Sequence, residues 1–524
     1  MARARSARRE TRPASQEREL PRVRLVASRE LAGAAGADLL AVPVAPAAAG
    51  DDEPQPRAGA ADAAAAYGVD LAAVCEQEGF TGSAGSVLGI PVGALAGSGG
   101  GLPARLLLVG VGDGGVVALR RAGAALARAS RKRSRVATTV ATTVAADIAR
   151  PARQAFVEGL LLGAYAPPRT GLGEGPDLAA GVVDLLGCSD DAAVSRARMA
   201  AQATWTVRDL ANTPSSTKNP AWVAEQARRL ARGVDGVEVQ VLDAADLAAG
   251  GFGGILAVGS GSASQPCLVT VTWTPPAPAG RARHVVLVGK GITYDTGGLS
   301  IKPREAMVSM KTDMAGSAVV LATVLAAARA GVGHRVTALL PLAENAVSGS
   351  AYRPGDVVTV FGGTTVEIAN TDAEGRMVLA DALAYADARL DPDVLVDIAT
   401  LTGAAAQGLG RRHAALYTSD DRLASGLEAA ADATGERVWR MPLVEDYRSA
   451  LDSEIADVRH VPETSPGGGS ITAALFLREF VGGRRWAHLD IAGPGRAEKD
   501  EHEVTKGASG YGARLLLRWL ESLR

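Results

Sequence analysis

The segment VVLVGKGI (residues 285–292) is followed by AGSAVVLATVLAAARA (315–330) and then by HRVTALLPLAE (334–344). The first and third segments contain long apolar runs, which are typical of strands that are buried on both faces of a sheet. The middle segment is rich in Ala and Leu and predicts a helix. A strand, a helix and a second strand in this order indicate a βαβ unit in a largely parallel sheet.

The same alternation extends in both directions along the chain. It predicts a helix at 377–390 and strands at 366–376, 393–405 and 486–493. Short apolar runs and helical patterns also alternate between about residues 21 and 185, and a long helix is expected from Asp190 to about Asn212. We therefore expect an α/β protein with a disordered basic tail (1–20), an N-terminal α/β domain (21–190), a linker helix (191–212) and a larger second α/β domain (213–524).

Composition narrows the class of protein. The chain has 524 residues, of which 47% are hydrophobic and 21% are charged, so it can bury a large core. Its net charge of -2 gives no overall attraction to nucleic acid or anionic membranes. Cys75, Cys188 and Cys267 lie far apart, without metal-type or disulfide spacing, which suits a reducing cytoplasm. The uncharged stretch 79–104 has the length of a membrane helix, but its glycines and prolines predict loop and strand instead.

Two patterns suggest sites but have simpler interpretations. Gly110, Gly112 and Gly115 follow an apolar strand in a G-x-G-x-x-G pattern, but the acid that dinucleotide sites place about 20 residues later is missing. A strand-to-helix turn is the preferred interpretation, with nucleotide binding as the alternative. The six histidines lack the H-x-x-x-H spacing of zinc peptidases. His488 lies within an apolar strand and is expected to be a core histidine.

Four acids stand at the ends of predicted strands, beside Gly, Ala or Thr: Asp295, Asp313, Asp372 and Glu374. An extended segment would point Asp372 and Glu374 to the same side. Converging carboxylates cannot all stay ionised without cations, and hard divalent ions prefer oxygen ligands. The pattern therefore predicts a hydrolytic site with two metal ions. Acids that only cap turns are the alternative.

Three basic residues lie close to these acids in the sequence. Lys290 and Lys302 occupy apolar, Gly-rich surroundings, where burial would lower the pKa of a lysine. A neutral lysine can bind a metal, whereas a charged one can stabilise an oxyanion. Arg376 follows the two acids of the 370–376 turn and could hold an anion with two hydrogen bonds.

Taken together, the motifs resemble the leucine aminopeptidase family, the cytosol aminopeptidases with two metal ions. The resemblance covers about residues 190–510, and NTDAEGR (370–376) matches the signature of the family. The other matching segments are DLANTPS (209–215), VGKGITYDTGGLSIKP (288–303), MKTDMAGSA (310–318), PLAENAVSGSAYRPGD (341–356), DIATLTGA (397–404) and WAHLDIAG (486–493). The family fold joins a small N-terminal α/β domain to a larger α/β domain with a mixed, mostly parallel sheet that is flanked by helices.

The resemblance implies a role for each residue of the site. One ion would be bound by Lys290, Asp295, Asp313 and Glu374, and the other by Asp295, Asp372, Glu374 and the backbone carbonyl of Asp372. Manganese or zinc is expected, and magnesium or cobalt is compatible with the ligands. Lys302 would be catalytic and charged, whereas Lys290 would be neutral. Arg376 would hold a bicarbonate that acts as the general base. Tyr294 and Thr296 depart mildly from the residues that are commoner in the family.

The activity implied is the release of N-terminal residues, preferably leucine and other apolar ones, from peptides with a free amino group. A metal-activated water would attack the first peptide carbonyl. Met310, Asn370, Thr400 and Gly403 would contact the substrate, although simple core packing is the alternative for Met310. The resemblance also implies a homohexamer.

Two other functions remain as alternatives. One is an additional DNA-binding or architectural role of the oligomer. Its only supporting features are the basic tail and SRKRSR (130–135), and the near-neutral charge makes nucleic acid an unlikely partner. The other is a catalytically silent hexamer, which the intact set of metal and catalytic positions opposes.

Overall fold

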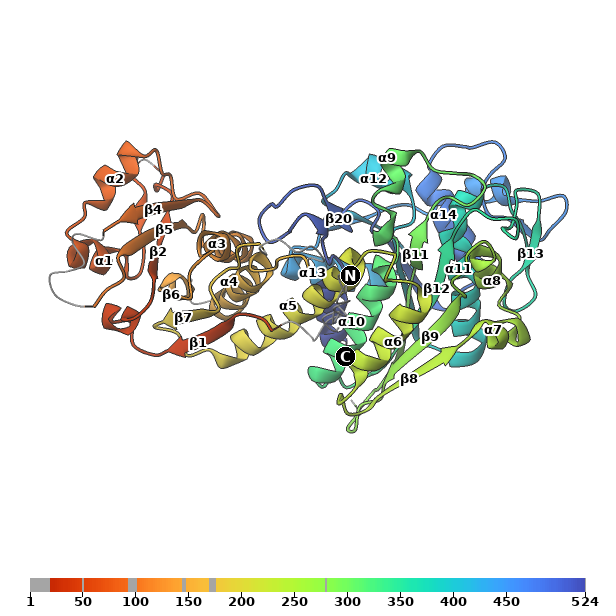
Figure 1. The fold of residues 1–524 in the computed structure, drawn as a ribbon, viewed down its shortest axis with the longest axis horizontal. Helices are drawn as coiled ribbons and strands as arrows, with labels where there is room; N and C mark the ends of the chain where they lie inside the picture. Colours follow the sequence, from red (N-terminus) through yellow and green to blue (C-terminus); the bar gives the residue numbers. More distant parts are fainter. Residues whose placement is uncertain are drawn as a thin grey trace, which may run out of the picture.

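The computed structural model describes residues 19–49, 51–92, 101–143, 148–168, 176–278 and 280–523. The predicted basic tail lies almost entirely outside these ranges, and so does part of the 79–104 segment. A smaller N-terminal α/β domain stands beside a larger C-terminal one, at the left and right of Figure 1. The predicted fold class is thereby confirmed.

The N-terminal domain is built on a seven-stranded sheet in the order β1-β7-β6-β2-β5-β4, with β3 beside β2. β3 and β4 run antiparallel to their neighbours, and the other pairs are parallel. The strands are β1 (Arg22–Val26), β2 (Leu39–Ala45), β3 (Gln55–Pro56), β4 (Val87–Pro91), β5 (Arg105–Gly110), β6 (Arg135–Thr138) and β7 (Val182–Leu186). The helices are α1 (Ala60–Tyr67), α2 (Leu71–Gln77), α3 (Val116–Ala129) and α4 (Ala149–Gly163).

The C-terminal domain has a nine-stranded sheet in the order β17-β16-β19-β15-β10-β12-β9-β8, with β11 beside β12. Its centre is parallel, and β8, β9 and β16 form antiparallel pairs. The strands are β8 (Val237–Leu242), β9 (Cys267–Trp273), β10 (His284–Gly289), β11 (Gly291–Asp295), β12 (Arg335–Asn345), β15 (Val394–Ala399), β16 (Ala414–Tyr417), β17 (Val438–Arg440) and β19 (Arg485–Asp490).

Helices cover both faces of this sheet. They are α6 (Pro220–Ala231), α7 (Ala244–Gly250), α8 (Gly253–Gly259), α9 (Arg304–Met307), α10 (Ala315–Arg329), α11 (Glu374–Tyr385), α12 (Gly403–Leu409), α13 (Asp421–Thr434), α14 (Gly469–Arg478) and α15 (Ala513–Ser522). Two small sheets complete the domain, formed by β13 (Val357–Thr359), β14 (Thr365–Glu367) and β18 (Val458–Arg459), and by β20 (Arg496–Ala497) and β21 (Gly507–Ala508).

The central strands are buried on both faces, as their apolar sequences predict. Val285 and Leu287 of β10 belong to the core that includes α10 and α15. Val286 and Val288 of the same strand belong to the opposite core, with α11 and α14. Alternate side chains of one strand therefore enter two separate cores, which explains why the run contains no polar position.

The predicted long helix is α5 (Asp191–Asn212), which begins where the Asp190 side chain accepts a hydrogen bond from Ala193 N. Residues of its first half, such as Val194, pack in the core of the N-terminal domain. Residues of its second half, such as Val207, pack in the core of the C-terminal domain. In Figure 1, α5 passes from one domain to the other. The boundaries proposed above at 190 and 212 stay a prediction.

Three details differ from or refine the expectations. The 285–292 strand is two strands, β10 and β11, separated at Lys290. The strand predicted at 366–376 ends at Glu367, in β14. Among the described residues, one helical stretch, Met310–Arg329, has the length and hydropathy of a membrane span, but 89% of its most apolar window is buried within the fold. It is therefore the core helix α10 with the turn that precedes it.

Candidate metal centre

The predicted site residues meet at the carboxyl ends of the central strands. Lys290 separates β10 from β11, Asp295 ends β11, and Thr400 follows β15. Asp313 lies just before α10, and the 370–376 turn leads into α11. Close packing of α10 against the strands requires glycine at residue 316, because an added Cβ would collide with the Ile398 carbonyl and lie 2.7 Å from Lys290 N. This geometry brings Asp313 to the strand ends.

Lys290 contacts two of the acids that are predicted to bind the first ion. Its buried ammonium lies 2.8 Å from Asp313 Oδ2 and 2.8 Å from Glu374 Oε1. It also donates a hydrogen bond of 3.1 Å to the Thr400 carbonyl. The Thr400 hydroxyl donates to Asp313 Oδ1 at 2.6 Å. Thr400, which was expected at the substrate pocket, thus orients a carboxylate as well.

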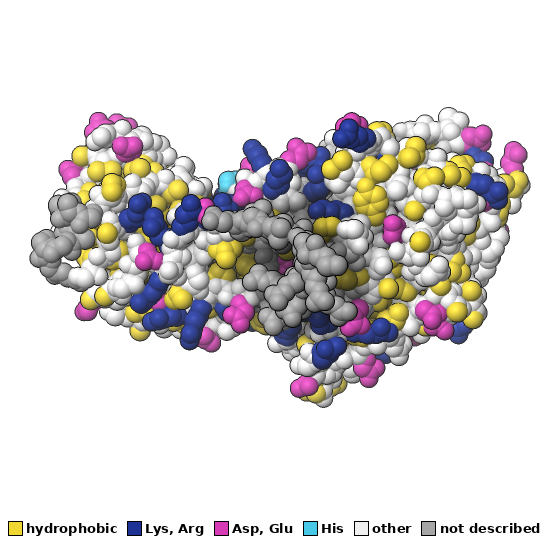
Figure 2. All heavy atoms as spheres, viewed as in Figure 1, with side chains coloured by type: hydrophobic (Ala, Val, Ile, Leu, Met, Phe, Trp, Pro, Cys, Tyr) yellow, Lys and Arg dark blue, Asp and Glu magenta, His cyan; other side chains and the backbone are white. Residues whose placement is uncertain are grey.

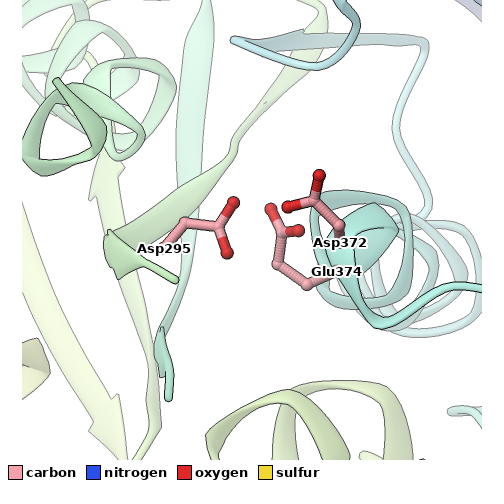
Figure 3. Close-up of side chains that lie close together, drawn as sticks. All are labelled: Asp295, Asp372 and Glu374. Carbon is pink, nitrogen blue, oxygen red and sulfur yellow. The ribbon is translucent and has the colours of Figure 1, made fainter. Parts of the chain in front are cut away.

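Lys302 contacts two of the acids that are predicted to bind the second ion. Its ammonium lies 2.9 Å from Asp295 Oδ2 and forms an ion pair with Asp372 Oδ1. Asp295, Asp372 and Glu374 each offer one oxygen, and these atoms all lie within 4.8 Å of one another. Figure 3 shows the carboxylate of Asp295 directed across the site toward those of Asp372 and Glu374. The predicted convergence of the acids is therefore present in the fold.

The backbone at the signature turn differs from our expectation. We expected Asp372 and Glu374 to share a side because the segment is extended. Residues 371–373 instead form a 3₁₀ turn, and Glu374 is the first residue of α11. The Asn370 side chain accepts a hydrogen bond from Asp372 N at 2.8 Å, which closes the turn. The two carboxylates converge through helix initiation and not through strand alternation.

Burial and mutual repulsion disfavour ionisation of the acids. Burial, reinforced by Asp295, raises the pKa of Glu374 to about 8. Burial also raises the pKa values of Asp313 and Asp372, although Lys290 and Lys302 respectively oppose the change. An additional positive charge at the centre of the cluster would therefore be stabilised by all three carboxylates.

The two lysines do not show the opposite pKa shifts that we expected. Burial alone would lower the pKa of Lys290, but Asp313, Glu374 and Asp295 together raise it. Burial would likewise lower the pKa of Lys302, and Asp295 and Glu374 raise it. The expectation followed from the roles that the resemblance implies, a neutral Lys290 at a metal and a charged Lys302. In the structure the neighbouring carboxylates outweigh burial at both lysines.

The residues present fit divalent cations. Glu374 Oε2 is buried and, among the described residues, has no hydrogen-bond partner, which is costly for a carboxylate oxygen unless a cation contacts it. The donors are carboxylate oxygens and the Lys290 nitrogen, which would release a proton on binding an ion. Such a set suits manganese, magnesium, cobalt or zinc.

Arg376 lies on the first turn of α11, beside the acids. It is half-buried, and its guanidinium donates a hydrogen bond to the His460 carbonyl. Burial lowers the pKa of Arg376 to about 10, against the effects of Asp490 and Glu374, so it stays charged at neutral pH. His460 in turn donates through Nε2 to the Asn370 carbonyl at 2.9 Å. These contacts fix a half-buried cation next to the signature turn.

The other expected substrate residues surround the cluster. Met310 is half-buried at the start of the 3₁₀ turn that leads to Asp313. Gly403 begins α12, three residues after Thr400. Asp490, at the end of β19, accepts hydrogen bonds from Leu401 N and Thr402 N at 3.1 Å and so shapes the loop between Thr400 and Gly403.

Several residues that organise the site were not predicted from the sequence. Asn345 donates to Asp295, His460 accepts from Arg376 through its carbonyl, and Asp490 holds the 400–403 loop. Asn345 and Asp490 each end a buried strand, so their position at the carboxyl edge was a usable signal. His460 follows β18, which is two residues long, and had no such signal.

The structure also shows the surroundings of His488 and of the Gly110–Gly115 pattern. His488 is fully buried, with Nδ1 2.5 Å from Asp397 Oδ1, as expected for a core histidine with a partner. Gly110 ends β5, and Gly115 immediately precedes α3, so the G-x-G-x-x-G pattern spans a strand-to-helix turn.

Three basic side chains of the segment SRKRSR (130–135) form ion pairs with acids. Arg131 lies 3.5 Å from Asp500, Lys132 lies 3.2 Å from Asp177, and Arg135 lies 2.5 Å from Asp184. On the face drawn in Figure 2, basic and acidic side chains are interspersed. These neutralised positions do not support the DNA-binding alternative.

Comparison with known proteins shows the family of the chain. The catalytic domain of the cytosol aminopeptidase family matches residues 205–517, and the N-terminal domain of that family matches residues 41–169. A probable cytosol aminopeptidase of Streptomyces coelicolor is 42% identical over 519 residues, which cover 93% of this chain and 96% of the relative. Another, from Leifsonia xyli, is 47% identical over 383 residues, which cover 70% and 76%.

Solved structures share the fold over nearly the whole chain. The bottromycin maturation enzyme BotP in complex with Mn is 37% identical with a TM-score of 0.80, and the match covers 93% of this chain and 99% of that chain. A mutant of tomato leucine aminopeptidase is 30% identical with a TM-score of 0.84, covering 97% and 98%. By sequence, fold and site, this chain belongs to the cytosol aminopeptidase family and is a metal-dependent aminopeptidase.

Proposed function

We propose that the cluster is a two-ion centre that releases N-terminal residues, preferably leucine and other apolar ones, from peptides. One ion would be held by Lys290, Asp295, Asp313 and Glu374, and the other by Asp295, Asp372 and Glu374. The single observation that carries this proposal is the meeting of three carboxylates within 4.8 Å beside two lysines. Manganese is the first candidate because BotP, a structural neighbour, is in complex with it, and zinc is the second.

Bound ions would supply Lewis-acid chemistry at a water and at the scissile carbonyl. The charged Lys302 ammonium, 2.9 Å from Asp295 Oδ2, would donate toward the carbonyl oxygen as that oxygen gains negative charge. Arg376 stays protonated and can hold a small anion such as bicarbonate as a proton acceptor. Met310, Asn370, Thr400 and Gly403 would contact the substrate.

The direct test is hydrolysis of leucyl p-nitroanilide by metal-stripped protein, before and after addition of manganese or zinc. We expect activity only with metal, and only on the substrate with a free amino group. The N-acetylated substrate is the matched control, because a blocked amine cannot be recognised. Metal-independent cleavage, or equal cleavage of both substrates, would contradict the proposal.

We also propose that the chain acts as a homohexamer in the cytoplasm. Membership of the family supports both statements. Light scattering should give a mass six times the 53.3 kDa of the chain. A stable monomer with full activity would argue against the assembly.

A further inference from the structure

Asn345 ends β12 and is buried, with 1% of its surface exposed. Its side-chain nitrogen donates at 2.8 Å to Asp295 Oδ1 and at 3.0 Å to the Thr371 carbonyl. An amide nitrogen has two hydrogens, so both are used. One side chain thus joins the end of β11 to the turn that contains Asp372.

The two oxygens of Asp295 have different surroundings. Oδ1 accepts hydrogen bonds from Gly297 N and from the Asn345 amide, each at 2.8 Å. Oδ2 lies 2.9 Å from the Lys302 ammonium and belongs to the cluster of acids. Oδ1 is therefore occupied by neutral donors of the chain, which leaves Oδ2 to face a cation.

We propose that Asn345 is a positioning residue for the metal centre, which it serves in two ways. It occupies Asp295 Oδ1, so that Asp295 offers the ions Oδ2 alone, and it fixes this carboxylate relative to the signature turn through Thr371. This inference rests on the ligand role proposed above for Asp295. Hydrogen bonds to a metal-binding carboxylate set its orientation, and their loss typically weakens metal binding about 10- to 100-fold.

A neighbouring residue provides a matched control. The Tyr352 hydroxyl donates at 3.0 Å to the same Thr371 carbonyl, and Tyr352 is also buried. Among the described residues, the Tyr352 hydroxyl has no hydrogen bond to an acid of the cluster. Tyr352→Phe therefore removes one buried hydrogen bond from the Thr371 carbonyl and leaves the Asp295 contact intact. If Asn345 acted only by holding the Thr371 carbonyl, substitutions of Asn345 and of Tyr352 would change metal binding to the same extent.

The experiment measures equilibrium binding of Mn²⁺ to the stripped full-length protein by calorimetry, with bound metal counted by elemental analysis. Asn345→Leu keeps the approximate volume and removes the donors, whereas Asn345→Ala avoids any steric conflict. We expect both variants to bind Mn²⁺ about 10- to 100-fold more weakly. We expect Tyr352→Phe to stay within about threefold of the parent, since no ligand contact changes. Thermal unfolding of each stripped protein confirms that the fold is retained.

The outcomes separate the inference from the proposed function. Parental Mn²⁺ affinity in a folded Asn345→Leu or Asn345→Ala protein would overturn the positioning role. Equal weakening in Tyr352→Phe would also overturn it, because the effect would then pass through Thr371 alone. Asp295→Ala is the reference variant and should lose Mn²⁺ from the centre. If Asp295→Ala retained parental binding, the ligand assignment itself would be wrong.

Discussion

Gly375 sets the position of the Lys290 ammonium, and replacing it should disable the site without unfolding the protein. A Cβ added at Gly375 would lie 2.5 Å from Lys290 Cε and 2.7 Å from Lys290 Nζ. An ordinary contact begins near 3.4 Å, so the end of the lysine must retreat by roughly 0.9 Å. That movement breaks the 2.8 Å contacts of Lys290 with Asp313 and Glu374.

The expected size of the effect follows from this displacement. A misplacement of about 1 Å in an active site costs about 100-fold in rate, which is about 2.7 kcal/mol of transition-state stabilisation. The helix itself should tolerate the change, because replacing glycine by alanine within a helix gains about 0.5–1 kcal/mol. Gly375→Ala should therefore lower kcat/KM strongly and leave thermal unfolding nearly unchanged.

The assay is hydrolysis of leucyl p-nitroanilide at saturating manganese, together with thermal unfolding. Gly408→Ala is the matched control, because it also lies in a helix and its added Cβ meets nothing within 4 Å. It should keep parental activity. If Gly375→Ala stayed within threefold of the parent in kcat/KM, the reasoning that Lys290 must occupy this position would be refuted.

Four further outcomes are expected. Asp372→Ala should remove most activity, with a melting temperature close to that of the parent because its side chain is 32% exposed; near-parental rates would count against its ligand role. Thr400→Val removes the 2.6 Å hydrogen bond to Asp313 and should weaken manganese binding about tenfold by calorimetry. Burial lowers the pKa of His460 to about 4. Below pH 6.5 the unfolded chain binds a proton at His460 before the folded protein does, so the stability contributed by the neutral imidazole is present above pH 6.5 and is lost as pH falls toward 4. The loss is at most about 3 kcal/mol. His460→Gln should flatten that part of the melting-temperature profile, and an unchanged slope would exclude His460 as its source. Arg208→Met should cost about 3 kcal/mol or more in chemical denaturation, because Arg208 donates to the carbonyls of Leu162, Ser509 and Glu503 at 2.8–3.0 Å; a smaller loss would mean that water replaces the guanidinium.

The sequence predicts the fold class well because burial on both faces leaves a simple pattern. The apolar run 285–288 of β10 contains no polar position, since its alternate residues face two cores. The pattern does not reveal that the strand is divided at Lys290, because that break depends on which neighbour each half pairs with. β10 pairs with both β12 and β15, whereas β11 pairs with β12.

The site was predictable where charged residues stand in apolar surroundings, and less so where neutral residues support them. Asp372 and Glu374 were found by their unusual setting, although the reason given for their convergence was wrong. The pKa shifts of Lys290 and Lys302 could not be foreseen, because they depend on distances to carboxylates from separate segments. The place of Asn345 at a strand end was visible in the sequence, but its two hydrogen bonds, to segments 50 and 26 residues away, were not.

The course of α5 limits how this protein can be divided or recombined. Its first half completes one hydrophobic core and its second half completes the other. Trp205 on this helix donates to the Leu161 carbonyl of the N-terminal domain, and Arg208 bonds carbonyls from both domains. A fragment cut on either side of α5 would leave apolar surface open to water and therefore prone to aggregation. A chimaera with a relative should have its junctions outside α5. It should exchange α5 together with the surfaces of both domains that pack against it.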